Sequence, residues 1–66
     1  MKITPVHIID EKCYRVYVIF NGTKQQVGKD YCYSDKKSQN KQWLNCLRYA
    51  REIESQVEYG KNNNND

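Results

Sequence analysis

The stretch CYRVYVIFNGTKQQVG, residues 13–28, decides the fold of this chain. β-branched and aromatic side chains fill nearly every position of its first half, which is typical of a β-strand. Asn21 and Gly22 follow, and both residue types tolerate the positive φ angles of a two-residue type I′ turn. We therefore predict a hairpin in which residues 23–28 fold back onto residues 13–20 as an antiparallel strand.

A two-residue turn fixes the register of this hairpin and, with it, the face on which each side chain lies. The predicted cross-strand pairs are Phe20 with Thr23, Val18 with Gln25, and Val16 with Val27. Because side chains alternate along a strand, one face should hold the core residues Tyr14, Val16, Val18, Phe20 and Val27. The other face should hold Arg15, Tyr17, Ile19, Lys24 and Gln26.

The sequence on either side of the hairpin predicts one more strand and the start of a helix. Residues 6–10 are apolar and β-branched, so they are expected to form the first strand. Residues 29–33 form a tyrosine-rich connection that packs rings against the sheet edge or adds a short extended piece. Ser34 is a candidate N-cap, and Asp35 is placed to favour the positive end of the helix dipole.

The predicted helix ends at Gly60, because glycine readily adopts the left-handed conformation that closes a helix. Its apolar stripe at helical spacing consists of Trp43, Leu47, Ala50, Ile53 and Val57, widened by Leu44 and Cys46. The Asn-rich tail, residues 61–66, is polar and low in complexity, so it is expected to be disordered. Residues 1–60 are thus predicted to form one small α+β domain, a three-stranded antiparallel sheet packed on one C-terminal helix. The opposite face of that sheet stays uncovered.

Length and charge narrow the classes of protein. A chain of 66 residues has room for one domain and no large enzyme core. No apolar run reaches the roughly 18 residues of a membrane span, and residues 1–5 lack the apolar stretch of a signal peptide. We therefore expect a cytoplasmic protein without a membrane partner. The net charge of +3 divides into an acidic end and a basic body, residues 1–51, with ten Lys and Arg against four acids. Such a body permits a polyanionic partner.

Catalysis and metal binding are not expected. His7 is the single histidine, and no nucleophile pattern lies near it; a phosphate loop, paired carboxylates and a His-Glu-x-x-His motif are also lacking. The three cysteines, Cys13, Cys32 and Cys46, are odd in number and widely spaced, so we expect reduced thiols that pack as small hydrophobes. Structural zinc sites usually bring their ligands in close pairs. Neither a metal nor another cofactor is predicted.

The uncovered sheet face favours nucleic-acid binding. A ribbon of two or three strands can enter the major groove, where Arg binds guanine, Gln binds adenine and Lys contacts phosphate. Arg15, Lys24 and Gln26 project from this face, and Tyr17 can stack or pack on sugars and thymine methyl groups. The expected flanking residues are Lys12, Lys29, Lys36 and Lys37. An ordinary solvated sheet face would also carry Lys and Gln, but exposed Tyr17 and Ile19 lower solubility unless a partner covers them.

Four segments, YRVYV at 14–18, NGTK at 21–24, VG at 27–28 and LRYARE at 47–52, occur in the order found in a known domain. Over about residues 13–54 the chain resembles the ethylene-response-factor type (Apetala-like) of DNA-binding domain, in the versions found in phage and mobile-element integrases and endonucleases. The resemblance implies a three-stranded sheet that packs on one helix and inserts into the major groove. It implies base and backbone contacts from Arg15, Tyr17, Lys24 and Gln26. Small domains of this fold commonly target a recombinase or endonuclease to its site.

A protein partner is the alternative hypothesis. A small domain without catalytic groups is also expected of a phage or plasmid product that binds and inhibits or redirects a host protein. The interface would then be the same sheet face, or the acidic helix end with Glu52, Glu54 and Glu58, because Tyr and Arg are enriched in protein interfaces too. Salt separates the two hypotheses, since DNA binding through several Lys and Arg weakens steeply as salt rises.

Overall fold

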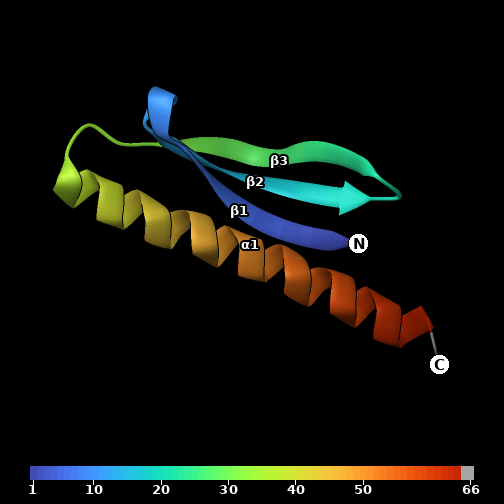
Figure 1. Ribbon diagram of the computed structural model, residues 1–66. Helices are drawn as coiled ribbons and strands as arrows, with labels where there is room; N and C mark the ends of the chain where they lie inside the picture. Colours follow the sequence, from blue (N-terminus) through green and yellow to red (C-terminus); the bar gives the residue numbers. More distant parts are fainter. Residues whose placement is uncertain (65–66) are drawn as a thin grey trace.

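Three strands precede one long helix in this computed structural model, which describes the backbone of residues 1–64 and the side chains of residues 1–57. The elements are β1 (Lys2–Ile8), the 3-10 turn η1 (Ile9–Glu11), β2 (Cys13–Phe20), β3 (Thr23–Cys32) and α1 (Lys36–Asn64). The strands form one antiparallel sheet in the order β1-β2-β3. Helix α1 runs along one face of this sheet (Figure 1). The predicted α+β architecture is confirmed.

The β2–β3 hairpin has the predicted register. Phe20 pairs with Thr23, Val18 with Gln25 and Val16 with Val27. Asn21 and Gly22 have φ angles of 51° and 79°, the positive values that a two-residue hairpin turn demands of both central residues. The dipeptide Asn-Gly therefore sets the face on which every side chain of the hairpin lies.

The first strand lies earlier in the chain than predicted. It covers Lys2–Ile8 rather than residues 6–10, and Ile9–Glu11 form η1. Pro5 lies inside β1, where it pairs with Val16. β1 is an edge strand with a partner on one side only, so a proline without an N–H donor is tolerated there.

Strand β3 continues through part of the predicted connection and ends at Cys32. Between the pairs Val16–Val27 and Tyr14–Tyr31 the register shifts, because Arg15 alone faces residues 28–30. This β-bulge begins at Gly28, whose φ of 76° suits a residue without a side chain. Two additional residues in one strand keep the alternation of faces, so the strand resumes regular pairing after the bulge.

Asp35, rather than the predicted Ser34, caps α1. The Asp35 Oδ1 atom accepts a hydrogen bond of 2.8 Å from the backbone N–H of Ser38. The Ser38 Oγ atom accepts hydrogen bonds from the backbone N–H groups of Asp35 (3.0 Å) and Ser34 (2.9 Å). These reciprocal bonds form a capping box and satisfy N–H groups that the helix itself leaves free. Hydrogen bonds from Ser38 lower the pKa of Asp35.

The end of the helix also differs from the prediction. α1 extends to Asn64, so Gly60 lies within the helix and does not end it. A glycine inside a helix costs about 1 kcal/mol relative to alanine, which a long helix can accommodate. The expected disorder of residues 61–66 remains a prediction, and residues 65–66 lie outside the described part of the chain.

The core lies between α1 and the covered face of the sheet. Its buried residues are Tyr14, Val16, Tyr31, Cys46 and Ala50. Partly buried side chains around them are Ile3, Val27, Tyr33, Trp43 and Tyr49. In the described part of the chain no helix combines the length and the apolar character needed to span a membrane.

Two residues expected in the core are largely exposed. Phe20 is 58% exposed and Leu44 is 54% exposed. Phe20 lies on the expected face of β2, but it is next to the hairpin turn, where the sheet and α1 diverge (Figure 1). Leu44 lies two positions before the buried Cys46, so the helical repeat places it on the opposite side of α1.

Aromatic side chains fill the space near the start of the helix. His7 stacks on Tyr14 with ring centroids 4.4 Å apart, and its Nε2 atom is 2.7 Å from the Tyr33 hydroxyl. Trp43 of α1 packs on the Tyr14 ring at 5.0 Å, and the Gln39 amide donates to the Tyr14 hydroxyl at 3.1 Å. The single histidine is exposed and packs on the rings of Tyr14 and Tyr33.

Candidate functional site

The face of the sheet that α1 leaves uncovered holds the four central residues that were predicted to bind nucleic acid. We call it the open face. By the strand register it carries Lys2, Thr4 and Val6 of β1, Cys13, Arg15, Tyr17 and Ile19 of β2, and Lys24, Gln26 and Cys32 of β3. Asp30 of the β3 bulge joins this face through its hydrogen bonds with Arg15 and Gln26. The open face therefore combines basic, amide and apolar side chains on regular strands.

The four central residues of the prediction lie together on this face. Tyr17 pairs with Gln26 across the two strands, and the Lys24 Nζ atom lies 4.6 Å from the centroid of the Tyr17 ring. Arg15 and Gln26 both donate to the carboxylate of Asp30. Their side chains thus form one connected set across β2 and β3.

Arg15 is held by two carboxylates that the sequence did not indicate as site residues. Its Nε and Nη2 atoms donate to Asp30 Oδ1 and Oδ2 at 3.0 and 3.3 Å, and Nη2 lies 3.1 Å from Glu11 Oε2. Hydrogen bonds from Arg15, and then from Gln26, lower the pKa of Asp30. Hydrogen bonds to Asp30, and then to Tyr17, raise the pKa of Arg15.

These contacts make the open face less basic than the sequence suggested. Lys2, Arg15 and Lys24 supply three positive charges, and Asp30 and Glu11 supply two negative charges that both pair with Arg15. Asp30 reaches Arg15 through the β3 bulge, and Glu11 reaches it from η1. The sequence did not predict either of these contacts with Arg15, because it predicted neither the bulge that positions Asp30 nor the turn that positions Glu11.

Three of the four flanking lysines lie away from the open face. The Lys29 Nζ atom lies 5.4 Å from the centroid of the Tyr31 ring, which belongs to the core on the helix side. Lys36 and Lys37 are exposed in the first turn of α1, in the helix layer. Lys12 ends η1, immediately before β2, in a left-handed conformation with a φ of 52°.

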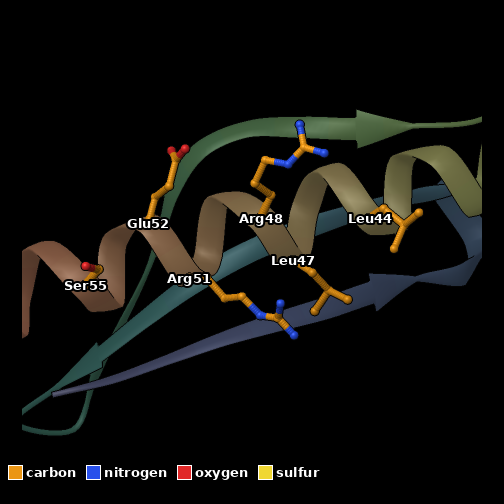
Figure 2. A pocket seen from close by; sticks show the side chains of 6 residues that line it. All are labelled: Leu44, Leu47, Arg48, Arg51, Glu52 and Ser55. Carbon is orange, nitrogen blue, oxygen red and sulfur yellow. The ribbon is translucent and has the colours of Figure 1, made fainter.

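A second basic surface lies on the outer side of α1. There a shallow hollow of about 460 Å³ is lined by Leu44, Leu47, Arg48, Arg51, Glu52 and Ser55. Figure 2 shows these side chains on the side of the helix that faces away from the sheet, with Arg48 and Arg51 diverging. From the sequence, these two arginines were counted in the basic body and assigned to no surface. They lie in a different layer and cannot join its four central residues in one contact.

One group of described side chains has the chemistry of metal ligands. The Sγ atoms of Cys13 and Cys32 and a carboxylate oxygen of Asp30 all lie within 4.8 Å of one another. The sequence did not predict this group, because Cys13 and Cys32 are far apart along the chain and the strand pairing brings them together.

Comparison with protein-family models, with curated proteins and with solved structures finds no significant match to this chain. The similarity to the ethylene-response-factor type of domain therefore remains a prediction, and the function is inferred from the geometry of the site.

Proposed function

We propose that this protein binds double-stranded DNA through the open face. The observation that carries the proposal is the clustering of Arg15, Tyr17, Lys24 and Gln26 on a sheet face without a covering layer. A β-ribbon of this kind fits the major groove, where arginine and glutamine recognise base edges. The fold keeps these side chains on regular strands, which limits the conformational entropy that binding must remove.

Each of the four residues has a distinct role in this proposal. The carboxylates engage Nε and Nη2 of Arg15, so Nη1 is the nitrogen that reaches a base or phosphate. Gln26 has the paired donor and acceptor that match an adenine edge. Lys24 contacts the phosphate backbone, and its stacking on Tyr17 orients it toward that contact.

The charge of the open face sets the expected salt dependence. Because Arg15 is paired with two carboxylates, Lys2 and Lys24 are the cations available to phosphate, which corresponds to a slope of log K against log salt of about −2. So few phosphate contacts suit a module that acts beside a second DNA-binding protein, as the targeting module of a recombinase or endonuclease does.

Paired substitutions test the location of the DNA contact. We expect Arg15→Ala together with Lys24→Ala to abolish retention of a short duplex in a gel shift, with the circular dichroism spectrum unchanged. The matched control is Arg48→Ala together with Arg51→Ala, which removes the same charge from the outer side of α1. Retention that survives the first pair, or that is lost equally with both pairs, contradicts a role for the open face.

The near neutrality of the open face favours one second candidate function. Because Asp30 and Glu11 oppose Arg15, the apolar parts of Tyr17 and Ile19 dominate the centre of the face. That composition is also found at protein interfaces, so a host protein is the alternative partner. A protein complex formed through these residues would keep most of its affinity between low and physiological salt, whereas a DNA complex would not.

A further inference from the structure

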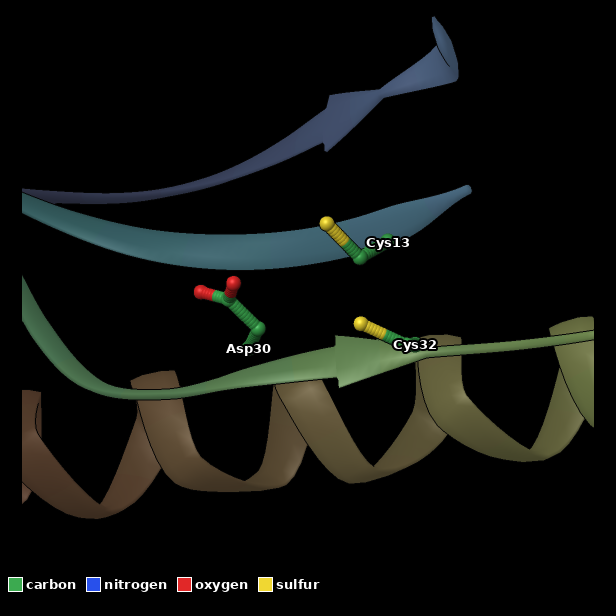
Figure 3. A group of neighbouring side chains, drawn as sticks. All are labelled: Cys13, Asp30 and Cys32. Carbon is green, nitrogen blue, oxygen red and sulfur yellow. The ribbon is translucent and has the colours of Figure 1, made fainter. Parts of the chain in front are cut away.

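Cys13 of β2 and Cys32 of β3 face each other across the sheet as a direct cross-strand pair. Asp30 lies two residues before Cys32, so both side chains project from the same face of β3. Figure 3 shows Cys13 on β2 and Cys32 and Asp30 on β3, with the Asp30 carboxylate directed toward β2. The three potential ligand atoms all lie within 4.8 Å of one another.

We propose that Cys13, Cys32 and Asp30 bind a divalent transition metal of the zinc type, with water as the fourth ligand. Zn²⁺ prefers tetrahedral sites in which sulfur lies at about 2.3 Å and carboxylate oxygen at about 2.0–2.2 Å. Neighbouring ligand atoms in such a site are roughly 3.5–3.8 Å apart. Side-chain rotations that move the ligand atoms by about 1 Å therefore suffice to bring them to this spacing. Cys13 is buried, but Cys32 and Asp30 are exposed, which leaves the fourth position open to solvent.

The carboxylate is already oriented as a metal ligand needs to be. Asp30 Oδ1 accepts from Arg15 Nε at 3.0 Å and from Gln26 Nε2 at 2.7 Å, and Oδ2 accepts from Arg15 Nη2 at 3.3 Å. Hydrogen bonds of this kind to a ligating group fix its direction and raise metal affinity. Oδ1 already accepts two hydrogen bonds, so Oδ2, which accepts one, is the oxygen that retains lone-pair capacity for a metal.

The charges of the site balance around a divalent ion. Two thiolates and one carboxylate leave one negative charge on the metal complex, and Arg15 neutralises it. Metal binding must displace protons from the thiols and therefore strengthens as the pH rises.

The sequence argued against metal binding because the cysteines do not form close pairs along the chain. Strand pairing supplies the missing proximity for Cys13 and Cys32. Cys46 is buried on α1 in the core, and His7 is engaged with Tyr33 on the covered face. Both stay outside the proposed site, which makes Cys46 a suitable control position.

Co²⁺ is the probe for this site, because thiolate ligands give its complexes strong sulfur-to-metal absorption in the near ultraviolet. The full chain is reduced with a phosphine, freed of metal and titrated with Co²⁺ and then with Zn²⁺. We expect a one-to-one complex with that absorption, its loss when Zn²⁺ is added, and a rise in Tm on binding either ion. The Gln26→Ala variant should bind Co²⁺ about tenfold more weakly.

Cysteine variants assign the ligands. Cys13→Ser and Cys32→Ser should each lose the sulfur-to-metal absorption and the metal-dependent rise in Tm, whereas Cys46→Ala should retain both. Cys32→Ser is the decisive variant if the buried position does not tolerate serine, because Cys32 is exposed. A wild-type protein with all three thiols reduced and no absorption at saturating Co²⁺ would overturn the proposal, and so would unchanged binding by Cys32→Ser. DNA retention is measured separately, so failure of the metal site is distinguishable from failure of the DNA contact.

Discussion

The ring of Tyr49 on α1 lies directly against the backbone of Gly28 in the β3 bulge, where a Cβ atom would collide with the ring. Gly28 also has a φ of 76°, a backbone conformation that residues other than glycine rarely adopt. The contact joins the helix to the irregular part of the sheet. Gly28 lies two residues before Asp30, which accepts hydrogen bonds from Arg15 and has a carboxylate oxygen within 4.8 Å of both thiols.

Replacement of Gly28 by alanine should therefore destabilise the protein more than replacement of Gly22. Both positions have positive φ, 76° and 79°, but nothing lies within 4 Å of a Cβ atom at Gly22. We expect Gly22→Ala to lower the free energy of unfolding by about 1 kcal/mol through backbone strain alone. Gly28→Ala should lower it by about 1–3 kcal/mol more, because the new Cβ atom clashes with Tyr49. Urea unfolding of the two variants measures the difference, and equal losses would show that Tyr49 moves aside freely.

The capping box predicts which residue at the start of α1 matters. Asp35→Ala removes the side-chain acceptor for the Ser38 N–H, so Tm should fall by several degrees. Ser38→Ala should have a similar effect, because its hydroxyl accepts from two backbone N–H groups. Ser34→Ala is the control and should leave Tm nearly unchanged. A larger loss in Ser34→Ala than in Asp35→Ala would restore Ser34 as the cap.

Stability should fall in acid because the pKa values of Asp30 and Asp35 are lowered in the folded protein. A lowered folded pKa means that the stabilising contribution is fully present above the pKa of an unfolded aspartate, about 4. That contribution is lost as the pH falls further, through the folded pKa. Tm measured from pH 6 to pH 2 should decline chiefly below about pH 4, and less steeply in Asp30→Asn and Asp35→Asn, whose own titrations are removed.

Neutralising Asp30 should strengthen DNA binding. In Asp30→Asn the guanidinium of Arg15 loses its bidentate carboxylate partner, and the open face gains one net positive charge. The slope of log K against log salt should then become steeper by about one unit, and the affinity at low salt should rise. Fluorescence anisotropy with a labelled duplex measures both. Glu52→Gln adds the same charge on the outer side of α1, and an equal effect there would mean that total charge, not the open face, governs binding.

Local chemistry explains why the hairpin could be predicted and β3 only in part. Asn21 and Gly22 dictate the turn, and alternation then assigns Arg15, Tyr17 and their partners to one face. The polar residues 29–30 read as a connection, but tertiary packing holds them in a bulged strand. The N-cap was misplaced by one residue, because Ser34 and Asp35 are both good capping residues and only their position relative to Ser38 decides between them.

The site was predictable to the same extent. The sharing of one face by Arg15, Tyr17, Lys24 and Gln26 follows from period two, which is a local property. The carboxylates around Arg15 and the proximity of Cys13 to Cys32 depend on contacts between distant segments. Lys36 and Lys37 lie at the start of α1, in the layer on the other side of the sheet from the open face, and their role in DNA binding stays a prediction.

Asp30 occupies a position where two binding events would meet. Its carboxylate accepts hydrogen bonds from Arg15 and Gln26, and it lies within reach of the two thiols. An ion bound to the two thiols and Asp30 would offset the negative charge that the carboxylate presents to the Arg15 guanidinium. The affinity of Arg15 for an anionic partner would then change. Thermodynamic linkage makes this effect reciprocal, so a polyanion on the open face would change the affinity for the ion by the same factor. A single carboxylate thus makes the two sites one coupled system.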